Sequence, residues 1–343
     1  MRAPDFWDRK TDGILPTLLR PLGCVVAGLA ALRLKRGRPY RAPVPVICVG
    51  NLVAGGAGKT PVALDIAARL ISRGVNAHVL MRGYGGREVG PLRVDPENHS
   101  AAQVGDEALL LARVAPTWVS RDRALGAQVA VEAGAQTIVL DDGFQNPTIH
   151  KDLSLLVVDG GYGFGNGRVM PAGPLRETME AGLKRADAVV LLGADDADVW
   201  GKVQRAGFKD LAVLRAKLTP PDDTQDLAGR EVYAFAGIGR PQKFFDTLTE
   251  LGCKLVGCKA FDDHHPYAGF EIEAILNDAR GATVVTTTKD YVRLNAEHRS
   301  QVRPVAVALA WKNDQDIDTV LDPVLNRIGS GNEGKNAGGD TDG

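Results

Sequence analysis

Several features that would assign a function at once are missing from this sequence. The chain of 343 residues carries a net charge of only −1, which excludes general binding to nucleic acid through an excess of positive charge. Its four cysteines are scattered without a C-x2-C pair. This argues against a cysteine-based metal site or a disulfide framework and favours reduced thiols in the cytoplasm. No internal repeat is evident, and the length allows two domains with cores of their own.

A long uninterrupted hydrophobic run is also lacking. Residues 14–34 are largely apolar, but Arg20 and Pro21 interrupt them, whereas a clean spanning helix needs about twenty apolar residues. The basic cluster at 33–41 follows this stretch, and a cleaved signal peptide would carry its positive charge in front. We therefore interpret residues 1–40 as a membrane-associating segment, with a helix in the membrane surface and its basic end on anionic headgroups. The alternative is an ordinary helix buried in the core.

The most informative motif that is present is GNLVAGGAGKTP at residues 50–61. A β-branched apolar segment precedes it and an amphipathic pattern ending at Gly74 follows, so the motif lies between a strand and a helix. In a phosphate-binding loop (P-loop), glycines let backbone N–H groups approach phosphate oxygens, and the helix start adds positive partial charge. Lys59 is expected to contact the β- and γ-phosphates and Thr60 to ligate Mg²⁺. The residues expected around the nucleotide are Val53, Ala54, Gly55, Gly56, Ala57, Gly58, Lys59 and Thr60.

This loop departs from the general pattern G-x4-G-K-[ST] at one position, because Val53 stands where the first glycine is expected. The alternative to a nucleotide site is a glycine-rich turn that binds nothing. The Gly-Lys-Thr ending and the flanking strand and helix favour a site for a nucleoside triphosphate.

Short apolar segments alternate with helical patterns over residues 41–219. This alternation predicts an α/β fold of the P-loop NTPase type, with a mostly parallel sheet and helices on both faces. After a stretch rich in proline and aspartate the alternation restarts, so residues 220–328 are predicted to form a second, smaller α/β domain. We expect the apolar segment 304–311 and a helix near 315–328 to complete that domain. The glycine-rich polar tail 329–343 is expected to be disordered.

Acidic residues stand at places where such sheets bind ligands, beyond the carboxyl ends of the strands. Asp141 ends the apolar segment 137–141 and is the expected P-loop carboxylate facing Mg²⁺, although such aspartates also simply begin turns. Asp142 follows it, and adjacent side chains of an extended chain point apart, so a separate task is expected. Asp106 begins a helical pattern, where it fits both an N-cap and a catalytic carboxylate; the pattern alone favours the cap.

The segment AFDDHHPYAGFEI at 260–272 places two aspartates and two histidines after a strand of the second domain. These four residues could bind a metal, but the sequence has no further ligands at a suitable spacing elsewhere. An imidazole beside a carboxylate suits proton transfer. The alternative is that the segment is only a polar helix cap. If the domains face each other, this loop would close onto the nucleotide. TTTKDY at 286–291 superficially resembles a guanine-binding motif. That motif needs one residue between Lys289 and Asp290, so we discount it.

In this order, GNLVAGGAGKTP, MRGYGGR, VGDEALLLA, LDDGFQNP, PAGPLRE and FDDHHPY resemble the tetraacyldisaccharide 4′-kinases, the lipid A kinases of Gram-negative bacteria. The resemblance covers about residues 14 to 310, and GNxxxGGxGKTP with DDGFQ is a specific combination. The family's loop also lacks the first glycine, which explains Val53. The resemblance implies transfer of the γ-phosphoryl group of ATP, with Mg²⁺, to the 4′-hydroxyl of a tetraacylated glucosamine disaccharide 1-phosphate. It also implies a location at the cytoplasmic face of the inner membrane.

The resemblance implies roles for single residues as well. Lys59 and Thr60 would hold phosphate and Mg²⁺, and Asp106 would be the catalytic base, assisted by His264, which overturns the preference for a cap. The other matched positions are the acidic pair near metal and substrate, Asp141 and Asp142, and the positions near the phosphates and the sugar, Arg123, Gln145, Arg176 and Glu177. Asn146 is a departure, because many members have histidine there, and a role of that histidine cannot be transferred.

Two other functions stay open from the residues themselves. One is a membrane-associated P-loop ATPase that acts as a switch without a lipid substrate, although a plain switch has no need of the DDHH segment. The other is a soluble small-molecule kinase whose N-terminal helix belongs to the core. The expected partners are the lipid disaccharide and the membrane surface; nucleic acid is not expected, and no protein partner is predicted.

Overall fold

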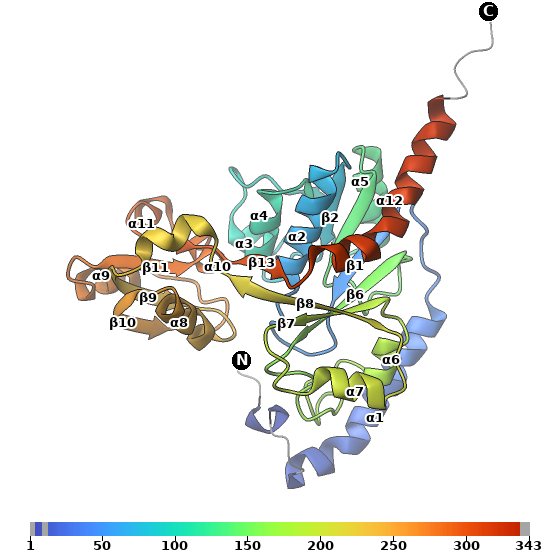
Figure 1. The fold of residues 1–343 in the computed structure, drawn as a ribbon, viewed down its shortest axis with the longest axis horizontal. Coiled ribbons are helices and arrows are strands. Elements are labelled where there is room, and N and C mark those ends of the chain that lie inside the picture. The colour runs from blue at the N-terminus through green and yellow to red at the C-terminus, as the bar shows by residue number, and fades with distance from the viewer. Residues whose placement is uncertain (1–3, 9–12, 337–343) are drawn as a thin grey trace, which may run out of the picture.

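The computed structural model describes residues 4–8 and 13–336 and consists of a larger and a smaller α/β domain (Figure 1). The larger domain begins with η1 (Asp5–Trp7), α1 (Ile14–Arg36), β1 (Val46–Gly50), α2 (Lys59–Ser72), β2 (Ala77–Met81), β3 (Leu92–Arg93), α3 (Ala101–Val104), α4 (Asp106–Ala112), β4 (Thr117–Val119), α5 (Arg123–Glu132), β5 (Thr137–Asp141), β6 (Leu153–Asp159), α6 (Met179–Leu183), β7 (Ala188–Leu192), α7 (Val199–Arg205) and β8 (Ala212–Thr219). The chain continues with η2 (Asp222–Leu227), β9 (Glu231–Ala236), α8 (Pro241–Glu250), β10 (Lys254–Ala260), α9 (Gly269–Asp278), β11 (Thr283–Thr287), α10 (Thr288–Tyr291), α11 (Ala296–Arg299), β12 (Arg303–Val305), β13 (Ala308–Trp311) and α12 (Asp314–Asn336).

The larger sheet confirms the predicted fold class. Within the described residues it has nine strands in the order β13-β8-β7-β6-β1-β5-β2-β4-β3. The seven inner strands run parallel, and only the edge strands β3 and β13 pair antiparallel with their neighbours. Strand β1 lies near the centre, with β5 on one side and β6 on the other. The loops after these strands therefore meet at one edge of the sheet, where ligands of such folds bind.

Helices cover both faces of this sheet because each inner strand is buried on both sides. Ile47 and Val49 of β1 face a core that includes apolar residues of α2, α4 and α12. Val46 and Cys48 alternate with them and face a core that includes residues of α5, α6 and α7. Side chains of a strand point to opposite faces in turn, so the continuous apolar sequence of β1 produces two cores with β1 between them.

The smaller domain has the same three-layer arrangement. Its four strands are parallel, in the order β10-β9-β11-β12. Phe244 and Phe245 of α8 pack on one face of this sheet, and Ile272 and Ile275 of α9 pack on the other. Each core is small but closed by a helix.

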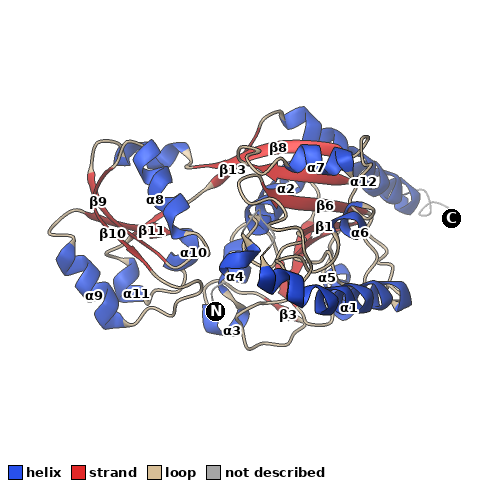
Figure 2. Cartoon of the chain, turned by 90° about the horizontal axis from the view of Figure 1, so that it is seen from below, coloured by secondary structure: helices blue, strands red, loops and turns tan. Residues whose placement is uncertain are grey.

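The end of the chain differs from the sequence expectation. The apolar segment 304–311 does not stay in the smaller domain but divides between β12 of the small sheet and β13, which pairs antiparallel with β8 in the large sheet. Helix α12 follows it and buries Ile317, Leu321 and Val324 in the core of the larger domain. Figure 1 shows α12 lying on that domain, and Figure 2 shows β8 and β13 side by side between the domains. The smaller domain is thus an insertion between these two strands.

The predicted tail is also partly ordered. Helix α12 continues to Asn336, so residues 329–336 are helical where disorder was expected, and residues 337–343 lie outside the described residues. A helix that is already anchored by packing can propagate by local hydrogen bonds, at little cost per added residue. The glycine-rich composition of the tail is therefore not sufficient to predict where the helix ends.

Helix α1 is the one helix of the described residues that is long and apolar enough to cross a membrane, judged by length and composition. Only 11% of its apolar window is buried, and large side chains such as Ile14, Leu18 and Leu29 are exposed. It rests on the larger domain through a few contacts, among them Val26 and Ala27. The alternative of an ordinary buried core helix is therefore wrong, since the described residues leave most of the apolar surface of α1 uncovered.

Candidate active site

The predicted P-loop connects β1 to α2 at the carboxyl edge of the large sheet. Gly58 precedes the helix with φ +80°, and a Cβ atom there would lie 2.4 Å from Leu192 Cδ1, so only glycine fits this turn without strain. The N-cap residue Gly58 has no side chain to cap the first N–H groups of α2, and such uncapped groups suit an anion. Lys59 Nζ donates to Asn51 Oδ1 at 3.4 Å and lies 3.7 Å from Asp142 Oδ1.

Thr60 and Asp141, which the sequence assigns to Mg²⁺, lie in direct contact. Thr60 Oγ1 donates to Asp141 Oδ2 at 2.9 Å; Thr60 lies in the first turn of α2, and Asp141 ends β5. Asp141 is buried, and its Oδ1 atom has no hydrogen-bond partner within the described part of the chain. Burial raises the pKa of the Asp141 carboxyl, the Glu107 carboxylate raises it further, and Lys59 opposes both. A cation at Oδ1 would relieve this cost.

Asp142 has hydrogen-bond partners different from those of Asp141. Its backbone is left-handed, with φ 56°, a conformation that aspartate tolerates better than most residues. Its Oδ1 accepts a hydrogen bond from Arg176 Nη1 at 3.0 Å. Burial alone would raise the pKa of Asp142, but the charges of Lys59 and Arg176 hold it below its usual range. Asp142 is therefore an ionised partner of two cations beside the P-loop.

The loop that carries Arg176 and Glu177 buttresses the P-loop directly. Ala54 N donates to Pro174 O at 2.8 Å, and Arg176 N donates to Leu52 O at 2.8 Å. These backbone bonds surround the bridge between Val53 and Leu175. Val53, which stands in place of the first glycine, therefore lies in a strand-like contact. An extended backbone does not require the positive φ angle that glycine allows, so valine is accommodated there.

Glu177 lies beneath this contact and is largely buried. Arg185 Nη1 donates to Glu177 Oε2 at 2.7 Å, and Gln145 Nε2 donates to Glu177 Oε1 at 3.1 Å and to Asn51 O at 2.9 Å. Gln145 in turn accepts from Arg176 Nη1 at 3.3 Å. The chain of contacts joins the DDGFQ segment, the PAGPLRE segment and the P-loop into one rigid unit.

Arg123 begins α5 and is 3% exposed. Its Nη1 donates to Ser120 O, whereas its Nε atom has no partner among the described residues. Burial lowers the pKa of Arg123 to about 10, opposed chiefly by the carboxylate of Asp142. The guanidinium therefore stays charged at neutral pH, close to the acidic pair and with a donor unused.

Asp106 and His264 come from different domains and meet at the domain interface. His264 Nδ1 lies 3.2 Å from Asp106 Oδ2, and the ring packs edge-on against Tyr84 of the MRGYGGR segment. Asp106 Oδ2 also accepts from Arg293 Nε at 3.0 Å and from Arg293 Nη2, and its Oδ1 accepts from Glu107 N at 2.9 Å. Asp106 is thus buried at the start of α4 but does not cap it in the usual way, through N–H groups further into the helix.

The charges around Asp106 keep it ionised. Burial alone would raise the pKa of Asp106, but the hydrogen bond with His264 and the charges of Lys289 and Arg293 hold it well below its usual range. Lys289 Nζ lies 3.3 Å from Glu107 Oε1 and 3.4 Å from His264 Nε2. A charged Lys289 can only donate, so a hydrogen bond here requires Nε2 to accept and Nδ1–H to donate to Asp106.

Sequence reasoning missed the cations of this cluster. Lys289 and Arg293 lie in and just after TTTKDY, which was considered only as a base-binding motif and discounted. The sequence signal for these cations is a lysine next to an aspartate, with an arginine three residues after the aspartate. Asn51 lies within the P-loop motif, but the motif does not predict its contact with Lys59.

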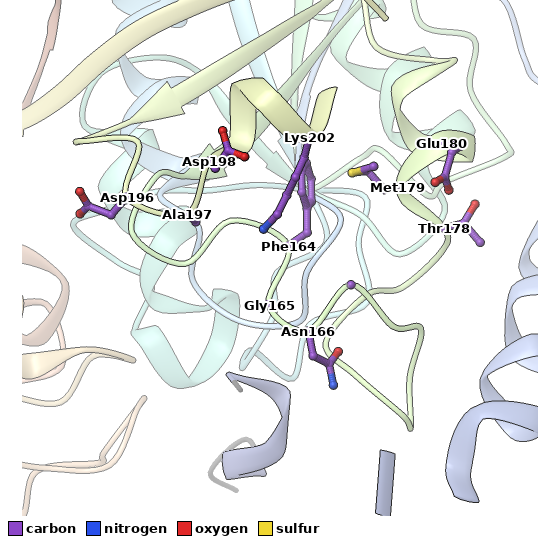
Figure 3. A pocket seen from close by; sticks show the side chains of 11 residues that line it. Phe164, Gly165, Asn166, Thr178, Met179, Glu180, Asp196, Ala197, Asp198 and Lys202 are labelled. Atoms are coloured by element: carbon purple, nitrogen blue, oxygen red, sulfur yellow. The ribbon is translucent and has the colours of Figure 1, made fainter. Parts of the chain in front are cut away.

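A separate hollow of about 520 Å³ lies between the loop after β6 and the starts of α6 and α7. Figure 3 shows Phe164 and Lys202 on its wall, with Asp196 and Asp198 at one side. None of the site residues predicted from the sequence lines it. Among the described residues, no group of three or more His, Cys, Asp and Glu side chains is arranged to hold a metal.

Comparison with known proteins gives a consistent result. The sequence model of a family described as tetraacyldisaccharide-1-P 4′-kinase matches residues 15–326. The tetraacyldisaccharide 4′-kinase of Rhodospirillum centenum is 54% identical over 336 residues, covering 95% of this chain and 97% of that protein. The enzyme of the same name from Paramagnetospirillum magneticum is 53% identical, covering 96% and 99%. Among solved structures, LpxK from Aquifex aeolicus in complex with ATP superposes with a TM-score of 0.74 at 27% identity, covering 91% of this chain and 99% of that chain.

Proposed function

The chain belongs to the tetraacyldisaccharide-1-P 4′-kinase family, and from this membership and the site geometry we propose how it acts. It transfers the γ-phosphoryl group of ATP to the 4′-hydroxyl of a tetraacylated disaccharide 1-phosphate. A relative that was solved with ATP supports the nucleotide. The observation that carries the proposal is that the P-loop contacts the acidic pair, while the Asp106–His264 pair lies beside it, with Glu107, the neighbour of Asp106, close enough to raise the pKa of Asp141.

Binding of the triphosphate is assigned to the loop of residues 53–60 and the free N–H groups at the start of α2. Lys59 would move from Asn51 to the β- and γ-phosphates, since an ammonium on a flexible stem is easily redirected. Thr60 and Asp141 fit Mg²⁺, because Oδ1 of Asp141 is a buried oxygen without a hydrogen-bond partner among the described residues. When bound, Mg²⁺ would neutralise charge on the phosphate oxygens.

Proton acceptance is assigned to Asp106 with His264. A sugar hydroxyl is a poor nucleophile at neutral pH, and a positioned base that accepts its proton in the transition state accelerates the step. The 3.2 Å contact between His264 Nδ1 and Asp106 Oδ2 holds the imidazole so that its other nitrogen is an acceptor. Because His264 comes from the smaller domain, this pair is complete only when the domains are in contact.

The remaining residues supply charge and order. A loose phosphoryl-transfer transition state needs mainly alignment and charge neutralisation, which Lys59, Arg123 and Arg176 are placed to supply. Glu177 is buried against Arg185, so we assign it to holding Gln145 and Arg176 in place beside the substrate. Asp142 keeps Arg176 oriented toward the P-loop.

The exposed apolar face of α1 supports a site of action at a membrane surface. The lipid substrate cannot leave the bilayer, and an amphipathic or apolar helix with a basic end binds anionic headgroups. Arg33, Lys35 and Arg36 lie in the last turn of α1. We propose that the protein works on the cytoplasmic face of the inner membrane, where ATP is present.

The test is whether ATP consumption depends on the lipid. Purified protein with ATP and Mg²⁺ should convert ATP appreciably only when the tetraacylated disaccharide 1-phosphate is added, and the lipid should gain one phosphate. The Lys59→Ala variant should lose at least roughly 10²-fold in kcat, because it removes a donor from the transferring group. The exposed Lys209→Ala serves as control. Equal ATP hydrolysis without lipid would support the switch instead.

A further inference from the structure

The smaller domain supplies more than His264 to the carboxylate of Asp106. Arg293 Nε and Nη2 both donate to Asp106 Oδ2, the first at 3.0 Å. Both side chains are almost fully buried, Arg293 at 7% and Asp106 at 3% exposed. A buried carboxylate requires such a partner, because removing a charge from water without compensation is costly.

Arg293 is itself held rigidly by its own domain. Its Nη1 donates to Asp290 Oδ1 at 2.8 Å and to Gly237 O at 3.0 Å. Asp290 is fully buried and also accepts from Gly237 N at 3.1 Å and from Tyr267 Oη at 2.8 Å. The guanidinium is therefore shared between two carboxylates and cannot follow Asp106 if the domains move apart.

Other charged groups also face Asp106. From the smaller domain these are His264 and Lys289, whose Nζ lies 4.0 Å from Asp106 Oδ2, with Asp263 behind Lys289. From its own helix the neighbour is Glu107, which pairs with Lys289. Among the described residues, Arg293 alone gives this carboxylate two side-chain donors, and both reach Oδ2, so it fixes the position of that oxygen.

We propose that Arg293 is a positioning residue that keeps the carboxylate of Asp106 ionised and aimed at His264, and so makes proton acceptance depend on the placement of the smaller domain. This rests on the proposed function, in which Asp106 is the base. A buried base without a cationic partner would take up a proton from water and could then accept none from the substrate. Because Asp290 shares the charge of Arg293, Asp106 keeps part of its basicity.

The test combines single and double variants in the full chain, assayed with ATP, Mg²⁺ and the lipid disaccharide. Arg293→Met should lower kcat by roughly 10- to 100-fold, as expected for a misplaced catalytic group, with the KM for ATP changed less than about threefold. It should also move the acid limb of the kcat profile to higher pH, because burial then acts on Asp106 with fewer opposing charges. Arg293→Lys, which keeps one donor, should recover part of kcat.

Asp106→Asn should lower kcat by roughly 10²–10⁴-fold, and adding Arg293→Met to it should lower kcat no further, since the arginine acts through the carboxylate. Lys243→Met is the matched control. It removes another interdomain ion pair, with Asp159 at 2.7 Å, and should leave kcat within about twofold of wild type.

The outcomes separate the two proposals. If Asp106→Asn retains wild-type kcat, the base assignment fails and this inference falls with it. If Asp106→Asn is impaired while Arg293→Met is not, or if the two effects multiply, the base stands and the positioning role of Arg293 is overturned. Should Arg293→Met fail to fold, judged by its thermal unfolding, Arg293→Lys in the same double variant decides between these outcomes.

Discussion

At the scale of the residue, Gly58 has to combine a left-handed backbone with close packing. An added methyl group would carry the cost of φ +80° and meet Leu192 Cδ1 at 2.4 Å. We expect Gly58→Ala to lower the free energy of unfolding by about 1–3 kcal/mol and to weaken ATP binding. The measurements are thermal unfolding of the nucleotide-free protein and calorimetric titration with ATP.

Gly56 in the same loop is the matched control for this substitution. Its backbone is not left-handed, and an added Cβ would meet nothing within 4 Å. Gly56→Ala should therefore leave the unfolding of the nucleotide-free protein nearly unchanged. Equal destabilisation by the two variants would contradict a special backbone requirement at Gly58.

The four thiols differ in reactivity for physical reasons. Cys24 and Cys258 are exposed, whereas Cys48 and Cys253 are buried. Burial raises the pKa of Cys48 to about 12, and the thiolate is the reactive form. We expect a disulfide reagent to modify Cys24 and Cys258 rapidly in the native protein and all four thiols after denaturation.

The pH dependence of Cys48 follows from the same shift. Between pH 7 and 10 Cys48 stays protonated because its raised pKa of about 12 lies above this range, so its labelling should stay slow throughout. Mass spectrometry of peptides after timed alkylation would check this. Rapid labelling of Cys48 at pH 9 would show that the interior of the P-loop domain opens readily.

The site could be predicted from the sequence only where a motif carries its own geometry. Lys59, Thr60 and Asp141 follow from the succession of strand, loop and helix, and the structure places Thr60 and Asp141 in direct contact. The contacts of Arg293 and Lys289 with α4 join positions more than 180 residues apart. No local pattern records such a contact, because it depends on how the two domains meet.

At the scale of the element, α1 presents large apolar side chains to its surroundings. Leu18, Leu22 and Leu29 are 70%, 55% and 62% exposed, and burial of a leucine contributes about 1.5–3 kcal/mol. We expect the triple change of these residues to glutamine to weaken binding to anionic lipid vesicles at least about tenfold, measured by flotation. ATP binding should persist, since the P-loop lies in another part of the fold.

The control for this element is Phe270→Gln in α9, which removes an equally exposed apolar side chain (77%) from the smaller domain. It should leave vesicle binding unchanged if α1 alone contacts the membrane. Loss of binding with Phe270→Gln but not with the triple variant would move the membrane contact to the smaller domain.

The alternation of apolar segments predicted most strands and helices but not which sheet each strand joins. The segment 304–311 is continuous and apolar in the sequence, yet two residues within it separate β12 from β13. Strand propensity is the same for both halves. Pairing partners are chosen by long-range packing, which a single sequence does not display.

At the scale of the whole molecule, β13 and α12 belong to the domain that begins the chain. A chain ending after residue 306 would uncover the core that Ile317, Leu321 and Val324 fill. Loss of each such side chain costs about 2–5 kcal/mol, so we expect this truncation to be insoluble. A chain ending after residue 330 should remain soluble and cooperative in thermal unfolding. Solubility of both would contradict the assignment of α12 to the large core.

The register of β8 with β13 has one more consequence. Thr219 and Ala308 face each other across that antiparallel ladder, so the polypeptide departs and comes back at neighbouring points. A tight two-residue hairpin turn could bridge them, giving a miniature that keeps the triphosphate cradle yet lacks the groups that hold Asp106. Such a shortened protein would bind nucleotide and phosphorylate nothing. Nucleotide binding would then be separated from phosphoryl transfer at the point where the smaller domain is inserted.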